Sequence, residues 1–483
     1  MESDNGIKLL IQNRTFEEME VGEQATLHRT LSKDDILLFA AVSGDVNPAH
    51  VDEEFARSDQ FQKIIAHGMW GAALISTVLG TELPGPGTIY LGQTLRFRKP
   101  VSIGDCLATT VTVKAKNSEN FRVIFDCQCV NQKGEVVISG EAEVLGPKNK
   151  ITRPRRVLPE VKLIERFVRF GELIRMAEPK AAIATAVAHP VDKVTLLNCV
   201  EARKNHLIEP ILVGPENKIR SVAEEAEIDL EGIRIVPAEH SHAAADIAAK
   251  MAAEGEVQLI MKGTLSSDEL LAAVRGTPQL RTGKTISHVH ALDIPTFRRT
   301  LFITDTEMND VQNLRTKMGI VQNAVGLLHA LGRACPKVAI LSASTYVDPR
   351  IPSTLDAAAL CKMAERGQIE GAIVDGPIPF DLAVSDDESH EVRPQSLVAG
   401  DAEILIAPDM EAGRILVQQL KRLIDASAAG IVLGLRVPIV LPGPRDNVRT
   451  CEASCALAAM WTHHSREQLD LKRRAKTPLV PLA

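Results

Sequence analysis

The chain has 483 residues, of which 45% are hydrophobic and 24% are charged, as expected for a globular protein of two or three domains. Its formal net charge of −7 argues against nucleic-acid binding, because no basic surface would offset phosphate repulsion. The opening residues, MESDNGIKLL, lack a basic stretch followed by an apolar one, and no apolar run is long enough to span a bilayer. We therefore expect no secretory signal, no membrane partner and a cytoplasmic location.

The eight cysteines are scattered along the chain. Cys127 and Cys129 alternate with polar residues, and Cys451 and Cys455 lie one helical turn apart. Neither pair has zinc-finger spacing, so we expect reduced, structural cysteines and no metal site.

The N-terminal part of the chain combines a polar string with one helix and several strands. The string FAAVSGDVNPAHVDEEFA, residues 39–56, places a carboxylate (Asp45), a carboxamide (Asn47), a proline (Pro48) and an imidazole (His50) within six residues. The strongly apolar segment Ile64–Leu79 predicts a buried helix, and it contains the sequence IAHGMWGAALIS. Period-two alternation then predicts strands at Thr109–Val113, Phe121–Cys127 and Val136–Val144. One helix wrapped by an antiparallel sheet is an α+β hotdog fold, whose free sheet edge favours a homo-oligomer.

Residues 146–160, GPKNKITRPRRVLPE, follow this part of the chain. They are rich in proline and basic residues, and their apolar residues show no periodic spacing. This composition predicts an interdomain linker. We expect a hotdog domain over residues 1–147, a linker over 148–160 and a second domain over 161–483.

In the second domain, apolar strand candidates alternate with amphipathic helical stretches such as Ala243–Ala253 and Leu355–Arg366. The strand candidates are Ile211–Val213, Ile233–Val236, Leu259–Met261, Val338–Leu341, Ile373–Val374, Ile404–Ala407 and Ile439–Leu441. This alternation predicts a two-lobed α/β domain with largely parallel sheets covered on both faces.

The polar string contains the groups that adding water to a conjugated thioester requires. Asp45 and His50 can move the protons, Asn47 can orient the loop or the water, and the backbone N–H of Gly68 at the helix start can donate to an enolate oxygen. His67 would fix that turn or contact the substrate. Asp-x-Asn-Pro is also an ordinary turn sequence, and a domain of this kind can bind acyl-CoA without turning it over.

The string resembles the active-site signature of the MaoC-like (R)-specific enoyl-CoA hydratases. The matching residues are Phe39, Ser43, Gly44, Asp45, Asn47, Pro48, His50 and Ala56. The one departure is Ala49, where a larger aliphatic residue is usual. The resemblance implies reversible syn addition of water to a trans-2-enoyl-CoA, giving a (3R)-hydroxyacyl-CoA.

From about Leu163 to its end, the chain resembles the phosphate acetyl/butyryl-transferase family, through the order and spacing of several stretches. These are LIMKGTLSSDELLAAV (259–274), LFITDTEMN (301–309), VAILSAST (338–345), VDGPIPFDLAV (374–384), LIAPDMEAGRILVQQL (405–420) and PIVLPGPRDN (438–447). The resemblance implies acyl transfer between coenzyme A and inorganic phosphate, with both as substrates and no bound cofactor.

Several residues of these stretches suit that chemistry. Ser342, Ser344 and Thr345 follow a strand and could cradle phosphate, unless they form an ordinary loop. Asp305 and Asp375 are expected at strand ends, where they either face a ligand or hold a turn.

Arg445 can bind phosphate through two hydrogen bonds. The family usually has a serine directly before this arginine, and here the residue is Pro444, with neither hydroxyl nor N–H.

The sequence therefore predicts a bifunctional acyl-CoA enzyme, a hydratase fused to a phosphate acyltransferase. The alternative is a hydratase whose second domain is a non-catalytic acyl-CoA sensor or oligomerisation module, which Pro444 motivates. The acyl chain length that either site accepts depends on side chains from distant strands and is not predicted.

Overall fold

The computed structural model describes residues 10–156, 158–159, 161, 163–385 and 396–476, with side chains to residue 471. The termini and residues 157 and 160 of the predicted linker lie outside this description. Backbone contacts divide the chain into two compact units, Met1–Leu163 and Ile164–Ala483, called unit 1 and unit 2 below. No helix of the described residues is long and apolar enough to cross a membrane.

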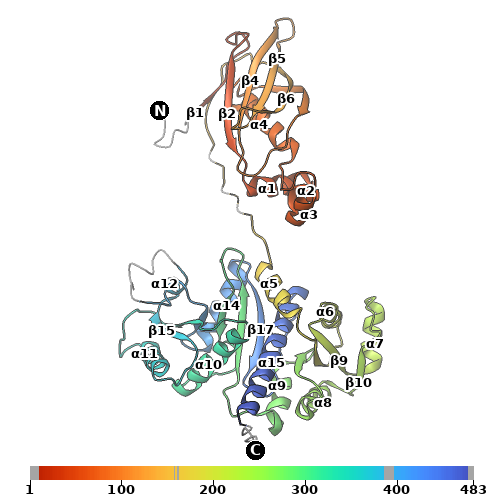
Figure 1. The fold of residues 1–483 in the computed structure, drawn as a ribbon, viewed down its shortest axis with the longest axis vertical. Coiled ribbons are helices and arrows are strands. Elements are labelled where there is room, and N and C mark those ends of the chain that lie inside the picture. The colour runs from red at the N-terminus through yellow and green to blue at the C-terminus, as the bar shows by residue number, and fades with distance from the viewer. Residues whose placement is uncertain (1–9, 157, 160, 162, 386–395, 477–483) are drawn as a thin grey trace, which may run out of the picture. The chain divides into compact units, whose positions relative to one another are not determined.

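Unit 1 is a five-stranded antiparallel sheet in the order β2-β4-β5-β6-β3, curled around helix α4 (Figure 1). The strands are β2 (Gln24–Thr30), β3 (Ile89–Phe97), β4 (Cys106–Asn117), β5 (Arg122–Val130) and β6 (Val136–Leu145). The helices are α1 (Lys33–Ser43), α2 (Pro48–Val51), α3 (Glu53–Ser58) and α4 (Gly68–Thr81). A small pair, β1 (Leu10–Gln12) and β7 (Thr152–Pro154), joins the two ends of the unit. The predicted helix and three strands are present.

The core of unit 1 forms between α4 and the inner face of the sheet. Alternate residues of β5 point inward, namely Val123, Phe125, Cys127 and Cys129. They pack with Ile75, Val78 and Leu79 of α4. The period-two pattern in the sequence reflects this burial of one face only.

Helix α4 begins four residues later than predicted. Ile65 forms a bridge with Ser102, and Ala66 donates its N–H to the Val101 carbonyl at 2.8 Å. These contacts hold the apolar residues before Gly68 in extended backbone, so apolar character there reflects burial rather than helix.

Gly140 of β6 allows the neighbouring strand β3 to approach closely. A Cβ atom at this position would lie 1.8 Å from the carbonyl oxygen of Thr94. We expect Gly140→Ala to destabilise unit 1 by about 1–3 kcal/mol, because the strands must separate. The measurement is urea unfolding of the full chain in a Trp461→Phe background, which leaves Trp70 of unit 1 as the fluorescent probe.

Gly80 of α4 is the matched control, because nothing lies within 4 Å of a Cβ there. Gly80→Ala should raise stability by about 0.5–1 kcal/mol, since alanine loses less entropy than glycine in a helix. A Gly140→Ala midpoint equal to that of the parent would contradict the close approach.

Unit 2 is built on one eleven-stranded sheet in the order β10-β9-β8-β11-β18-β17-β12-β13-β16-β14-β15. The strands are β8 (Ile183–Ala188), β9 (Ile208–Gly214), β10 (Arg234–Pro237), β11 (Leu259–Lys262), β12 (Ser287–Asp293), β13 (Leu301–Thr304), β14 (Lys337–Leu341), β15 (Ile373–Ile378), β16 (Ile404–Ile406), β17 (Ser427–Leu433) and β18 (Ile439–Val440). Strand pairs are parallel in both lobes, and only the central pairs β18–β17, β17–β12 and β12–β13 are antiparallel. The predicted largely parallel α/β lobes are confirmed, and they share a single sheet.

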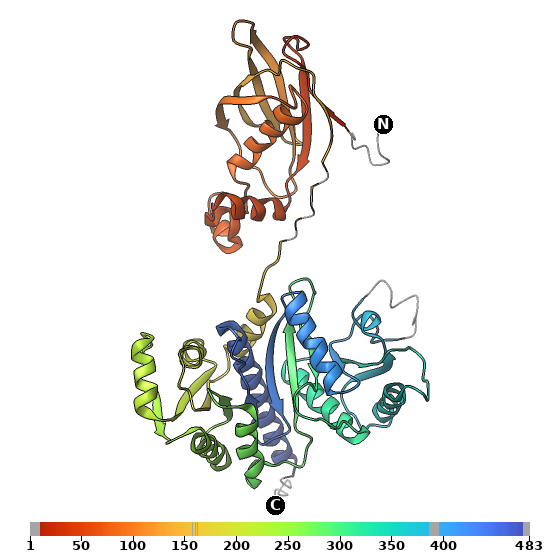
Figure 2. The ribbon, with the colours of Figure 1, turned by 180° about the vertical axis from the view of Figure 1, so that it is seen from behind.

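Helices cover both faces of this sheet, and the long helix α15 (Val448–Lys476) runs beside β17 at its centre (Figures 1 and 2). The other helices are α5 (Val168–Ala177), α6 (Lys193–Lys204), α7 (Glu216–Glu225), α8 (Ser241–Glu254), α9 (Ser267–Gly276), a 3₁₀ turn η1 (Pro278–Leu280), α10 (Leu314–Ala330), α11 (Pro352–Glu365), α12 (Phe380–Val384) and α14 (Met410–Leu423). The predicted helix Ala243–Ala253 lies within α8, and the predicted helix Leu355–Arg366 matches α11 except for its last residue, which caps the helix.

Candidate active sites

The polar string of unit 1 contains the C-terminal end of helix α1 and the start of helix α2. Helix α1 is closed at its C-terminus by Gly44, which has a φ of 76° and a backbone N–H bonded to Ala40, a conformation that favours glycine. Asn47 then caps α2, accepting the Ala49 N–H at 3.1 Å, with Pro48 at the first helical position. This local order puts Asp45 and His50 on either side of one short turn.

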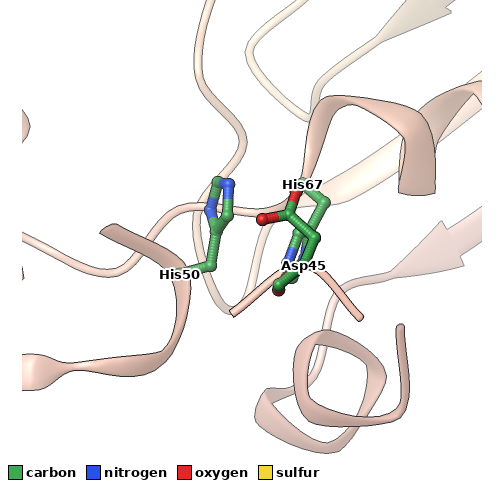
Figure 3. A group of neighbouring side chains, drawn as sticks. All are labelled: Asp45, His50 and His67. Atoms are coloured by element: carbon green, nitrogen blue, oxygen red, sulfur yellow. Dashed lines mark hydrogen bonds between the residues drawn. The ribbon is translucent and has the colours of Figure 1, made fainter. Parts of the chain in front are cut away.

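Asp45, His50 and His67 come together at this point (Figure 3). One carboxylate oxygen of Asp45 and one ring nitrogen of each histidine lie within 4.8 Å of one another. Asp45 is exposed, His50 is half-buried and His67 is 2% exposed. These three side chains are close enough together to bind a metal ion. Asp45 and His50 could also act as an acid–base pair, with the buried ring of His67 beside them.

Hydrogen bonds fix which nitrogen of each ring is available. His50 Nδ1 lies 2.9 Å from the carbonyl oxygen of Ile65, and a carbonyl only accepts. Nδ1 therefore carries the proton, and Nε2 of the neutral ring is free to accept one. His67 Nε2 likewise donates to the carbonyl of Asp45 at 2.9 Å, which leaves its Nδ1 buried without a partner.

His67 supports the site from behind. Its ring lies 4.0 Å from that of His50 and 5.0 Å from that of Phe39, between centroids. We expect His67→Ala to lower hydration about 10- to 100-fold, because His50 loses its stacking partner and the Asp45 loop loses a donor. His67→Gln, which keeps an amide donor, should recover part of the rate in the same assay. Full activity of the alanine variant would contradict a positioning role.

A cavity of about 350 Å³ opens beside His50 and the start of α4. It is lined by His50, Phe61, Ile65, Ala66, His67, Gly68, Trp70, Gly71, Phe97, Arg98, Lys99, Pro100, Val101 and Ile138. The backbone N–H of Gly68 is the first of helix α4, where donors lack helical partners. A Cβ at this residue would lie 3.0 Å from the Phe97 ring, so glycine keeps the approach open.

A second cavity, of about 660 Å³, lies in unit 2 at the ends of β11 and β18. Its basic lining residues are Lys262, Arg414, Lys421, Arg422 and Arg445, and its acidic ones are Asp268, Glu307, Asp310 and Asp446. Helix α14 contributes one face, through residues spaced as Met410, Arg414, Val417, Gln418 and Lys421. The cavity is thus a largely polar cleft with an excess of cations, as binding of phosphate groups requires.

Burial changes the titration of several lining groups. It lowers the pKa of Lys262, although Asp192 and Asp446 act in the opposite direction. It raises the pKa of Glu307 and lowers that of His288 to about 4, so this histidine is neutral near pH 7. The positive charge of the cleft therefore comes from lysine and arginine.

The loop after β18 presents Arg445. Asp446 holds this loop by accepting the Gly443 N–H at 2.8 Å, and it lies 3.5 Å from Lys421 Nζ. Arg445 is exposed and has no carboxylate within 4.0 Å among the described residues. Its guanidinium is available to a ligand.

Asp305, predicted to face a ligand or hold a turn, holds a turn beside the Arg445 cavity. Its side chain is 1% exposed and accepts the N–H groups of His288, Glu307 and Met308 at 3.1–3.2 Å. Asn309 also donates to it. The carboxylate thus holds the turn that carries Glu307 into the cavity.

Ser342, Ser344, Thr345 and Asp375 are not among the residues that line the Arg445 cavity. Ser342 Oγ lies 2.9 Å from Ser353 Oγ, and Ser344 Oγ accepts the Tyr346 N–H at 3.0 Å. These hydroxyls therefore stabilise the loop after β14.

The expectation that Asp375 ends a strand was wrong. It is the third residue of β15, because the strand continues through Gly376 to Ile378. Its carboxylate accepts the Gly376 N–H at 2.8 Å and the Ser396 hydroxyl at 2.6 Å.

Most of the cationic lining was not predicted from the sequence. Lys262 is the last residue of β11, and the same strand-end rule that selected Asp305 would have found it. Arg414 and Lys421 share one face of α14, which helical spacing alone could have shown. His288 and His290 carry no comparable signal, because only the sheet order brings β12 to this cavity.

Comparison with known proteins identifies both units. Residues 243–459 match the family described as "Phosphate acetyl/butaryl transferase", and residues 16–126 match the "MaoC like domain". A phosphate acetyltransferase of Rhizobium meliloti is 48% identical over 299 residues, which are 62% of this chain and 95% of that protein.

Solved structures similar to parts of the chain include the following two. A branched-chain phosphotransacylase from Enterococcus faecalis V583 has 26% identity and a TM-score of 0.52, covering 58% of this chain and 99% of its own. The R-hydratase PhaJ1 from Pseudomonas aeruginosa has 45% identity and a TM-score of 0.31, covering 32% of this chain and 99% of its own. The family models and the Rhizobium meliloti relative confirm both resemblances found in the sequence: the chain belongs to the phosphate acetyl/butyryl-transferase family and carries a MaoC-like domain before its transferase region.

Proposed function

We propose that the protein is a bifunctional enzyme that hydrates trans-2-enoyl-CoA in unit 1 and transfers acyl groups between coenzyme A and phosphate in unit 2. The observation that carries the first activity is the cluster of Asp45, His50 and His67, in which both histidines line the 350 Å³ cavity together with Gly68. The family of unit 2 carries the second.

In the hydration, a water molecule lies between the Asp45 carboxylate and His50 Nε2. One of the two takes a proton from the water as its oxygen bonds to the β-carbon, and a proton is returned to the α-carbon on the same face. The π bond is lost, and the product is a (3R)-hydroxyacyl-CoA. The Gly68 N–H stabilises the enolate oxygen that forms between these events. The Asn47 side chain keeps the loop in place by capping α2.

In the transfer, a phosphate oxygen attacks the thioester carbon, the carbon–sulfur bond breaks, and the products are an acyl phosphate and coenzyme A. The cations Lys262, Lys421 and Arg445 of the cavity offset the charge of phosphate and of the tetrahedral intermediate. The loss of the family serine at Pro444 removes one hydroxyl donor from this set but leaves the cations in place.

The alternative, a non-catalytic acyl-CoA sensor in unit 2, rests on Pro444 alone. A combined assay of wild-type protein decides between the two. We expect loss of the conjugated enoyl absorbance of crotonyl-CoA, and phosphate-dependent release of free thiol from acetyl- or butyryl-CoA. Binding of acyl-CoA without thiol release would favour the sensor, and unchanged enoyl absorbance would remove the hydratase.

We further propose a cytoplasmic homo-oligomer. All eight cysteines are free, as expected in a reducing compartment. Strand β3 is an edge of the unit 1 sheet and exposes Ile89, Leu91 and Phe97, a surface that a second copy can cover. Sedimentation velocity at two concentrations tests the oligomer, and a monomer would contradict it.

A further inference from the structure

Unit 2 contains another cavity, of about 720 Å³, that shares no lining residue with the Arg445 cavity. Four segments form it: residues 282–284 before β12, residues 326–334 of α10 and the turn after it, residues 434–436 after β17, and residues 461–469 of α15. Neither proposed reaction uses it.

The two cavities lie at different levels along the same elements. On α15, Ser454 lines the Arg445 cavity and Trp461 lines the other, a separation of about 10 Å at the rise of an α-helix. Gly430 of β17 lines the Arg445 cavity, and Gly434 in the loop after β17 lines the other cavity. These two residues are about 13 Å apart along extended backbone.

The lining of this cavity is basic. It includes Lys284, His329, Arg333, Arg436 and His464, and it has no aspartate or glutamate, although acidic residues outnumber lysine and arginine in the chain by 62 to 55. A concave surface with an uncompensated positive charge attracts small anions.

Two of these cations are free to bind a ligand. Lys284 and Arg436 have no carboxylate within 4.0 Å among the described residues. Arg436 donates one guanidinium N–H to the Ala253 carbonyl at 2.9 Å, which anchors the group and leaves other donors available. Arg333, by contrast, lies 3.4 Å from Glu403.

Burial lowers the pKa of His464, and the carboxylate of Glu467 acts in the opposite direction. The proposed positive charge of the cavity therefore comes from its lysine and arginine residues.

Trp461 adds a flat aromatic surface that is half-buried and held in place. A Cβ atom on Gly326 of α10 would lie 3.1 Å from the indole, so glycine at this position lets the ring pack directly on the helix. Nucleobases stack on tryptophan rings held in this way.

We propose that this cavity binds a nucleotide-sized organic phosphate, with the phosphate on Lys284 and Arg436 and the heteroaromatic ring on Trp461. The volume suits a ligand of that size, and guanidinium and ammonium groups are the usual partners of phosphate. A free nucleotide and the nucleotide end of coenzyme A share this chemistry. The site is additional to both proposed reactions and does not depend on either.

The chain contains two tryptophans, Trp70 in unit 1 and Trp461 in this cavity. In a full-length Trp70→Phe protein, the remaining fluorescence therefore reports on Trp461. We expect ADP to change it saturably, and Lys284→Ala with Arg436→Ala to weaken that binding at least tenfold. Arg445→Ala, which alters the other cavity, should leave the ADP affinity unchanged. No saturable change, or equal affinity in the double variant, would overturn the proposal.

Competition and sedimentation measurements test the class of ligand and the oligomeric state. If coenzyme A competes with ADP, the nucleotide end of the coenzyme is a ligand of the cavity. If it does not compete, the ligand is a free nucleotide. Both results agree with the proposal. Inorganic phosphate competing as well as ADP would overturn the contact with Trp461. Sedimentation velocity should give one mass for parent and double variant, and dissociation of the variant would instead assign these residues to a subunit interface.

Discussion

Asp45→Asn should lower crotonyl-CoA hydration by about 10²- to 10⁴-fold, the usual contribution of a positioned acid–base group. The carboxylate of Asp45 accepts the Asn47 N–H at 3.2 Å, and the asparagine carbonyl can still accept it. The turn therefore survives, while the negative charge and the proton-accepting oxygen are lost. The measurement is the initial rate of loss of enoyl absorbance, with kcat and KM determined separately.

Asp52→Asn is the matched control for this variant. Asp52 is an exposed aspartate of the same segment, and it caps α3 by accepting the N–H groups of Glu54 and Phe55. Asparagine caps a helix as well as aspartate does, so hydration should stay near the wild-type rate. A wild-type hydration rate in the Asp45→Asn protein would contradict the acid–base role of Asp45. Equal losses of hydration rate in the Asp45→Asn and Asp52→Asn proteins would show that the substitutions disturb the fold instead.

Arg445→Ala should lower kcat/KM for phosphate-dependent thiol release by about 10²-fold or more, as for loss of one donor to a developing oxyanion. The residue lines the 660 Å³ cavity and lacks a carboxylate partner among the described residues, so its removal leaves no buried charge unpaired. Hydration by unit 1 should be unchanged, which serves as an internal control in the same protein.

Arg466→Ala is the surface control, because Arg466 is exposed on α15 and lines neither the Arg445 cavity nor the Trp461 cavity. It should keep the wild-type thiol release. Acyl-CoA binding that persists in Arg445→Ala, together with a wild-type protein that never releases thiol, would identify unit 2 as a sensor instead.

The proximity of Asp45 and His50 was predictable because these residues are neighbours in the sequence. Asp45, Asn47 and His50 lie within six residues, so local rules of capping and turns place them together. Gly68 comes later, at the start of α4. The hydrogen bond between His67 and the Asp45 carbonyl was not predictable by local rules, since it joins residues 22 positions apart.

The Arg445 cavity was only partly predictable because distant segments assemble it. Arg445 stood out through its resemblance to a family motif, whereas Lys262, Glu307 and Lys421 meet it only through the order of the strands. The hydroxyls of Ser342 and Ser344 follow a strand as predicted, but β14 lies five places from β18 in the sheet. Periodicity identifies strands and says nothing about their order.

The single sheet of unit 2 shapes how its Arg445 cavity can open and close. Strand pairs connect β10 to β15, but β17 and β18 share a single residue pair, Val432 with Ile439. The two lobes are therefore parts of one sheet, and this pair is its narrowest connection. Changes in sheet twist at β17 and β18 and displacement of α14 can open the cleft while most of the ladder hydrogen bonds stay intact.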